Sequence, residues 1–242
     1  MPFEIKSSGW WNERIFSPAR FLCRSLLDFV YPPVCWGCHL SLSSDEFVLC
    51  HRCVKALPYL QQPALPASRL SWLQLEKIFF DSSLAVYQYS EIVQKLVHQF
   101  KYNGMTSLAS LFGKAIASRL SQNGDEIEAL VPVPLHKSRL RERGYNQSLL
   151  LAQQIAQVLG APVNKGQLVR VKNTISQATL SRQERMSNVT NAFQLKQPEV
   201  FGGKSIGLVD DVFTTGSTMN ECARLLKDAG ASSVMCISIV RV

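Results

Sequence analysis

The stretch that decides the fold runs Ser205-Ile-Gly-Leu-Val-Asp-Asp-Val-Phe-Thr-Thr-Gly-Ser-Thr218. It begins with an apolar strand, Ile206 to Val209, and places two carboxylates, Asp210 and Asp211, where that strand ends. A loop of small and hydroxyl-bearing residues follows, and then an amphipathic helix that ends at Gly230. Backbone N–H groups at a helix N-terminus attract anions, and small side chains let a phosphate approach closely. This order predicts a phosphate site whose carboxylates bind ribose hydroxyls or a magnesium ion.

Two better-known phosphate loops do not fit this chain. Gly203-Lys204-Ser205 looks like the end of a Walker A loop, but Pro198 stands where its first glycine belongs, and the segment precedes a strand. A GxGxxG sequence, which would indicate a dinucleotide site, is absent. The remaining alternative is an ordinary strand-to-helix turn, in which many specified positions would agree by accident.

The order of apolar strand, two acids, Thr-Thr-Gly, small residue and Thr resembles the 5-phosphoribosyl-1-pyrophosphate (PRPP) signature of type I phosphoribosyltransferases. The resemblance implies that Asp210 and Asp211 are the catalytic acids, which grip the ribose hydroxyls with Mg²⁺ as a bridge. It implies a PRPP-binding loop made of Asp210, Asp211, Val212, Thr214, Thr215, Gly216, Ser217 and Thr218.

The composition is that of a protein with a sizeable core. The chain has 242 residues, of which 46% are hydrophobic, which allows one medium domain and a small appendage. No apolar run approaches the ~18 to 20 residues of a membrane span, and the polar start lacks the pattern of a signal peptide. Residues 15–30 are expected to form an amphipathic helix, and the location is expected to be cytoplasmic.

The chain is basic, with a formal net charge of +8. Such a balance favours anionic partners, which include phosphorylated metabolites and nucleic acid. Many mildly basic enzymes bind no DNA, so charge alone leaves both possibilities open.

Four of the seven cysteines form a second strong pattern. Two CxxC pairs, Cys35 with Cys38 and Cys50 with Cys53, point four sulfurs at one centre, as in tetrahedral zinc sites. Four thiolates leave no open position for water, so the Zn²⁺ is expected to be structural. The other three, Cys23, Cys222 and Cys236, lie in apolar surroundings and are expected in the core.

Apolar strands alternate with helical patterns between residues 79 and 242, which predicts an α/β fold. We expect a type I phosphoribosyltransferase-like parallel sheet flanked by helices, with a small N-terminal four-cysteine zinc-binding module. The predicted domains are residues 1–60, an N-terminal helix and zinc module, and residues 72–242, the phosphoribosyltransferase-like domain. Gln61 to Ser71 is the predicted linker.

A second cationic loop is the expected partner of the acid pair, because PRPP carries a pyrophosphate as well as a 5′-phosphate. It would follow the strand at Val131-Pro-Val-Pro134 and use His136 and Lys137, with Arg143 as a further candidate. The alternative is a solvated basic face on a short helix. The polar stretch around Arg182 and Arg185 would be either a lid that excludes water or an exposed loop.

Several further segments resemble the ComF/GntX family and together cover residues 35 to 242. They are the two CxxC pairs, Leu96-Val-His-Gln-Phe-Lys-Tyr-Asn-Gly104, Pro132-Val-Pro-Leu-His136, Arg143-Gly-Tyr-Asn-Gln147, Leu149-Leu-Leu-Ala152, Thr174-x-x-Gln177, Leu180-Ser181, Glu184-Arg185, Asn188, Ala192-Phe193 and the PRPP signature. The resemblance implies a bacterial, cytoplasmic, phosphoribosyltransferase-like protein associated with natural competence, the uptake and integration of external DNA.

Two functions follow as hypotheses. In the first, the protein binds PRPP with Mg²⁺ and, if it is active, transfers the ribosyl phosphate as a phosphoribosyltransferase of the glycosyltransferase class. In the second, it is an accessory protein in DNA transactions whose PRPP fold is a sensor or relic. Single-stranded DNA, a competence helicase or other DNA-processing proteins would then bind the zinc module and the basic face from Arg139 to Arg143. The acceptor is not defined by the resemblance, and residues 79–120 are expected to cover the site.

Overall fold

A computed structural model describes residues 33–172 and 191–242. The chain divides into two compact units, Met1–Lys55 and Ala56–Val242, which are described separately. The expected helix at residues 15–30, Cys23 and the expected lid with Arg182 and Arg185 lie outside the described residues. None of the described helices combines the length and the apolar character needed to span a lipid bilayer.

The larger unit is built on one six-stranded sheet. Its strands are β1 (Ala64–Pro66), β2 (Ser82–Gln88), β3 (Ala129–Pro132), β6 (Ser205–Val209), β7 (Val212–Phe213) and β8 (Ser233–Arg241). The order is β1-β2-β8-β6-β3, with β7 beside β8, and every pairing is parallel except the one between β1 and β2. A separate antiparallel pair joins β4 (Leu168–Arg170) to β5 (Phe193–Leu195).

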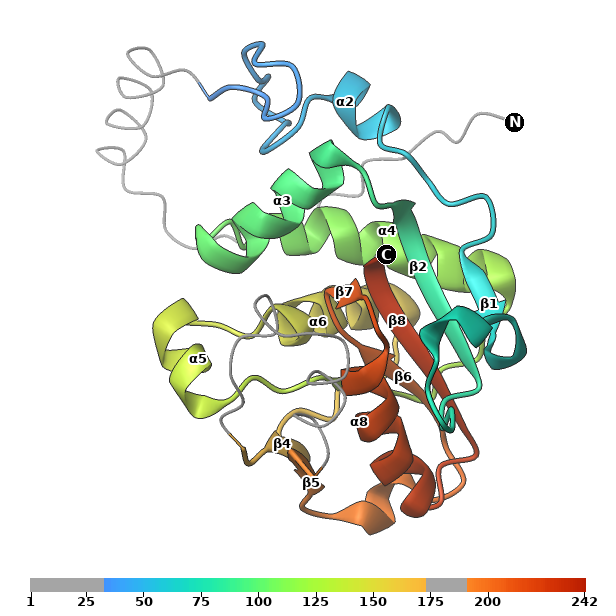
Figure 1. Cartoon of the computed structure of the whole chain (residues 1–242). Coiled ribbons are helices and arrows are strands. Elements are labelled where there is room, and N and C mark those ends of the chain that lie inside the picture. Colours follow the sequence, from blue (N-terminus) through green and yellow to red (C-terminus); the bar gives the residue numbers. More distant parts are fainter. Residues whose placement is uncertain (1–32, 173–190) are drawn as a thin grey trace. The chain divides into compact units, whose positions relative to one another are not determined.

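Helices cover both faces of this sheet (Figure 1). The helices are α3 (Glu91–Tyr102), α4 (Leu108–Asn123), α5 (Lys137–Arg143), α6 (Gln147–Leu159) and α8 (Ser217–Asp228). One face packs against α4 and α6, and the other against α8. This arrangement confirms the predicted α/β architecture with a mostly parallel sheet, in which ligands bind beyond the carboxyl ends of the strands.

The helices α4 and α6 approach each other closely at a glycine. A Cβ atom at Gly113 would lie 2.3 Å from the Cβ of Gln154. No side chain fits in that space, so only glycine allows the two helices to pack at this distance.

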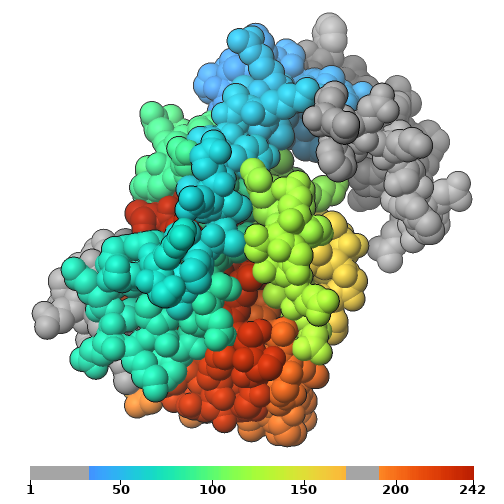
Figure 2. Space-filling view, turned by 90° about the vertical axis from the view of Figure 1, so that its right-hand side faces the viewer, coloured from blue at the N-terminus to red at the C-terminus, as the bar shows by residue number. Residues whose placement is uncertain are grey.

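The segment predicted as a linker is part of the sheet and of the core. Residues 64–66 form the edge strand β1, and the 3₁₀ turns η1 (Ala67–Arg69) and η2 (Ser71–Leu73) follow it. Leu70 and Leu73 are fully buried in the main hydrophobic cluster, beside residues of α8 and β8. Figure 2 shows this segment in teal, packed beside the red C-terminal part of the chain. The prolines favour a loop, but the burial of Leu70 and Leu73 removes apolar area from water and stabilises the segment on the sheet.

The smaller unit is described from residue 33 onward. Val34 bridges Ser41 in antiparallel fashion, and the short helix α2 (His51–Lys55) begins directly after Cys50 and contains Cys53. Cys35 is fully buried, whereas Cys38 is exposed.

Candidate functional site

The acid pair lies at the carboxyl end of β6, an interior strand between β8 and β3. The N–H of Asp210 donates to Ile237 O at 2.9 Å, and the N–H of Ile239 donates to Asp211 O at 3.1 Å. Both acids are therefore fixed to β8 through their own backbone. Asp211 is buried and Asp210 half-buried, so the sheet holds two carboxylates side by side with little access to water.

A lysine from outside the signature neutralises one of these acids. The ammonium of Lys101, in the last turn of α3, lies 2.9 Å from Asp211 Oδ1. Burial lowers the pKa of Lys101, but the charges of Asp211 and Asp210 outweigh burial and raise it. The lysine therefore stays charged and covers the acid pair.

The second carboxylate is held differently. Asp210 Oδ1 accepts hydrogen bonds from Ser148 Oγ and from the N–H of Asp211, both at 2.9 Å. Burial, together with the neighbouring charge of Asp211, raises the pKa of Asp210 from 3.8 to about 7, although Lys101 and these hydrogen bonds oppose the shift. Near neutral pH the Asp210 carboxyl therefore exchanges a proton with the solvent.

The loop after β7 begins α8 in the way expected of a phosphate loop. Gly216 is the N-cap of α8 and has a φ of 71°, in the left-handed region that favours glycine. Because Gly216 has no side chain, it makes no side-chain hydrogen bond that caps α8. Thr215 Oγ1 and Ser217 Oγ lie 3.0 Å apart. The N–H of Ser217 also donates to Thr215 Oγ1 at 3.4 Å, so these two hydroxyls lie together at the start of α8.

Acids, loop and several cations line one pocket of about 420 Å³. The expected residues in its lining are Asp210, Asp211, Val212, Thr214, Thr215, Gly216, Ser217, Thr218 and Arg143. Three further cations, Lys101, Arg139 and Arg170, also line it. Burial, and then the charge of Arg139, lowers the pKa of Arg170. An anion placed between these two guanidinium groups would relieve their repulsion.

His136 and Lys137 do not line this pocket. His136 is the N-cap of α5, where its ring Nδ1 accepts from the N–H of Ser138, and Lys137 is exposed. The basic segment that we expected as a loop is a helix, which corrects that expectation in favour of the short-helix alternative. Arg139 and Arg143 are four residues apart and share the face of α5 that lines the pocket.

The segment from residues 145 to 148 connects three parts of the site. The Tyr145 hydroxyl donates to Phe100 O, and the Gln147 amide donates to Lys101 O at 3.2 Å. Ser148 donates to Asp210, as described above. This segment therefore fixes the position of the last turn of α3 relative to the acid pair. Tyr145 and Gln147 occur in the family-like stretch quoted from the sequence, which gave no indication of their partners, whereas Ser148 was not part of it.

In the smaller unit, the four cysteines converge as expected. The sulfurs of Cys35, Cys38, Cys50 and Cys53 all lie within 4.8 Å of one another. Cys38 Sγ and Cys50 Sγ are 3.7 Å apart, which is close to the ~3.8 Å edge of a tetrahedron with Zn–S bonds of ~2.3 Å. This cluster could hold a metal ion.

Backbone groups favour the thiolate form of Cys35, whereas burial and the neighbouring cysteines raise the pKa of Cys53 to about 12. The N–H groups of Cys50 and Gly37 donate to Cys35 Sγ at 3.2 and 3.4 Å. Burial acts against ionisation of Cys35, but the hydrogen bonds outweigh it and lower the pKa of Cys35 to about 6. Such sulfurs are suited to a cation.

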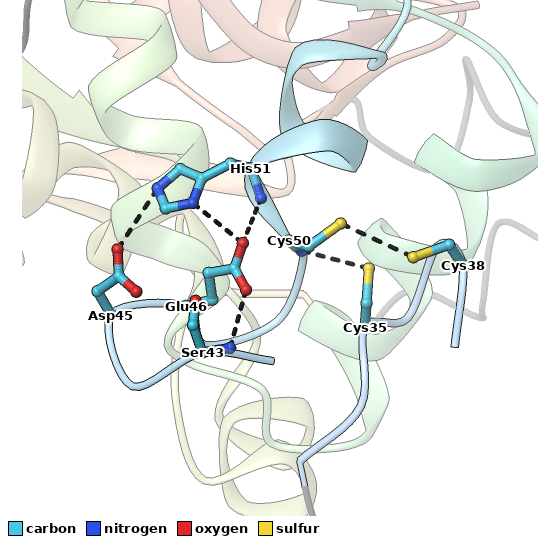
Figure 3. A network of polar contacts seen from close by, with 7 residues as sticks. All are labelled: Cys35, Cys38, Ser43, Asp45, Glu46, Cys50 and His51. Carbon is cyan, nitrogen blue, oxygen red and sulfur yellow. Dashed lines mark hydrogen bonds and ion pairs between the residues drawn. The ribbon is translucent and has the colours of Figure 1, made fainter. Parts of the chain in front are cut away.

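A carboxylate braces the loop between the two cysteine pairs (Figure 3). Glu46 accepts from the N–H of Ser43 at 2.9 Å and from the N–H of His51 at 2.6 Å, and its Oε1 lies 3.0 Å from His51 Nδ1. The backbone hydrogen bonds from Ser43 and His51 lower the pKa of Glu46 to about 2. Glu46 thus fixes the start of α2 directly after Cys50. No motif in the sequence indicated this role of Glu46.

Comparisons with known proteins identify relatives of this chain. Residues 145–242 match the family model of the phosphoribosyl transferase domain. Competence protein F of Haemophilus influenzae is 32% identical over 225 residues, which cover 90% of this chain and 95% of that protein. The DNA utilization protein YhgH of Salmonella typhimurium is 32% identical over 225 residues, which cover 84% of this chain and 94% of that protein. Among solved structures, the glutamine PRPP amidotransferase of Bacillus subtilis complexed with ADP and GMP aligns with a TM-score of 0.40 and 21% identity. This alignment covers 58% of this chain and 30% of that one.

Proposed function

Since the chain belongs to the competence protein F family and has its role in natural transformation, we propose that it binds PRPP with Mg²⁺ in the acid-pair pocket. The observation that carries this proposal is the pocket itself, where two carboxylates, a helix-start loop and four cations meet. A ligand with ribose hydroxyls flanked by two phosphate groups matches these three features one by one.

Each part of the pocket has a distinct task in this proposal. Asp210 and Asp211 accept hydrogen bonds from the ribose hydroxyls, and the loop from Thr214 to Thr218 donates to the 5′-phosphate. Arg139 and Arg170 bind the pyrophosphate and stabilise its charge. Mg²⁺ bound with the ligand adds further neutralisation of the phosphates, and the acid pair offers the oxygen atoms that such a hard cation prefers.

In the smaller unit, we propose that the four thiolates hold a structural Zn²⁺. The sulfur spacing and the backbone hydrogen bonds to Cys35 support this assignment. Four sulfur ligands complete a tetrahedron and leave no position for a substrate. Because the metal would be absent from the unfolded chain, its binding free energy would contribute to the folding of this unit.

Isothermal titration of the full chain with PRPP and Mg²⁺ tests the PRPP proposal. The wild type and Arg141→Met should bind alike, whereas Arg139→Met should bind at least tenfold more weakly. Arg141 lies on the same helix, is exposed and does not line the pocket, which makes it a matched control. No heat with the wild type, or equal affinities for the two variants, would contradict the proposal.

Whether the ribosyl group is then transferred is a separate question. Transfer would release pyrophosphate in the presence of an acceptor, and a panel of bases, amines and nucleic acid measures it directly.

The second candidate is an accessory role on DNA, in which the PRPP pocket acts as a sensor. It is supported by the net charge of +8 and by the basic residues that α5 carries. Contacts with single-stranded DNA, and through it with a helicase or other DNA-processing proteins, would be strongly salt-dependent. An affinity for oligonucleotides that does not change between low and high salt would exclude such contacts.

A further inference from the structure

A second pocket lies directly beside the acid-pair pocket. Its volume is about 930 Å³, and it extends along α3 from Gln94 to Tyr102 and across to the carboxyl ends of β7 and β8. Six residues line both pockets: Tyr89, Lys101, Tyr102, Val212, Thr214 and Thr215. We call the larger one the aromatic groove, since Trp72, Tyr89, His98 and Tyr102 line it.

The rings of the aromatic groove are presented to solvent. Trp72, Tyr89 and Tyr102 are 44%, 51% and 56% exposed, which is unusual for such large side chains on one surface. The His98 and Tyr102 rings lie 4.8 Å apart at their centroids, and the guanidinium of Arg143 lies 4.7 Å from the centroid of Tyr102. Flat rings with a cation stacked beside them form a platform for another flat ring.

The charge of the groove is one-sided. None of the described residues in its lining is an aspartate or a glutamate, whereas two of them, Lys95 and Lys101, are lysines. Each lysine is paired with an acid outside the lining, Lys95 with Glu91 at 2.6 Å and Lys101 with Asp211 at 2.9 Å. The phosphates of a polyanion could replace these carboxylates as the partners of the two lysines.

We propose that the aromatic groove binds unpaired bases of a single DNA strand. The bases would stack on Trp72 and Tyr102, while Lys95 and Arg143 would contact the phosphates. Exposed rings combined with cations are the pattern that recognises single strands, because only unpaired bases offer their faces. The volume lies near the upper end of the ~300–1,000 Å³ of pockets for one small molecule, so it has room for more than one base.

This inference rests on the DNA role given above as the second candidate function. It places most of the contact on α3 and on Trp72, and α5 contributes only its last residue, Arg143. Fluorescence anisotropy with a labelled 20-nucleotide oligo-dT tests it on the full chain. Trp72→Ala and Tyr102→Ala should each weaken binding by about tenfold or more, and Tyr102→Phe should bind like the wild type. Lys95→Gln should reduce the slope of log affinity against log salt by about 0.7, whereas Lys114→Gln on α4 should not change it.

Three outcomes would overturn the inference. The first is wild-type affinity in both alanine variants. The second is equal binding of a duplex of the same length. The third is loss of binding in Arg141→Glu alone, which would place the strand on α5 and leave the DNA role itself intact. Calorimetry with PRPP separates the two proposals, because Trp72 does not line the acid-pair pocket and Trp72→Ala should still bind PRPP if that function holds.

Discussion

Replacing Asp210 by asparagine is expected to stabilise the protein at neutral and alkaline pH, although it removes an acid of the proposed binding site. Asparagine has nearly the same shape, and its Oδ1 can still accept from Ser148 Oγ and from the N–H of Asp211. The substitution therefore removes mainly the cost of placing a second negative charge beside Asp211.

The magnitude follows from the pKa of Asp210, which rises from 3.8 in the ordinary case to about 7 in the folded protein. Below pH 4 the carboxyl is protonated in both states and makes no difference. Between pH 4 and pH 7 the unfolded chain loses the proton while the folded chain keeps it, so the free energy of unfolding falls as pH rises. A pKa difference of about three units corresponds to about 4 kcal/mol in the free energy of unfolding. The wild type has lost this amount of stability once the pH is above 7.

Urea unfolding of the wild type and of Asp210→Asn at pH 4.5, 6, 7 and 8 measures this effect. The variant's advantage should grow from about 1 kcal/mol at pH 4.5 to about 4 kcal/mol at pH 8. Glu126→Gln, which changes an exposed carboxylate, should give no pH-dependent gain. A constant difference across this pH range, or a variant less stable than the wild type at pH 8, would refute the reasoning.

Three other perturbations test separate features. Lys101→Met should cost about 2 to 4 kcal/mol of unfolding free energy at pH 8, because it leaves Asp211 without its ion pair, and adding Asp211→Asn should restore part of that loss in urea titrations. Gly113→Ala should cost about 2 to 3 kcal/mol in thermal unfolding, since the new Cβ cannot fit against Gln154, while alanine at Ser110 on the same helix should be neutral. Cys38→Ser should lower the zinc content of purified protein well below one ion per chain, as measured by elemental mass spectrometry, and zinc chelation should make the N-terminal unit more sensitive to protease.

The part of the site that is continuous in sequence could be predicted well. The strand β6, the acid pair, the loop and α8 follow one another directly, so local patterns alone determine their geometry. The cysteine cluster was predictable for the same reason, because two CxxC turns fix the direction of their own sulfurs.

Three of the four cations of the pocket, all except Arg143, could not be predicted in this way. Lys101 and Arg170 come from distant segments and reach the acids only because the sheet brings their elements together. Within residues 136–143, the choice between candidates depended on local conformation. Once the segment is a helix, Arg139 and Arg143 share a face, whereas His136 is used as the cap.

The predicted linker shows the opposite error. Prolines and small residues between Gln61 and Ser71 are typical of a loop, but Leu70 is fully buried and β1 pairs with β2. A strand of three residues leaves almost no periodicity in the sequence, so tertiary burial decides its conformation.

The position of Lys101 has a thermodynamic consequence. One ammonium group lines two neighbouring pockets, and it cannot contact Asp211 and a second anion at full strength at the same time. A ligand that draws Lys101 away from Asp211 changes the affinity of the acid pair for its own ligand, and linkage requires that the second ligand change the affinity for the first by the same factor. Anions bound in the two pockets would therefore be coupled through the charge of Lys101, and this coupling needs no movement of the sheet.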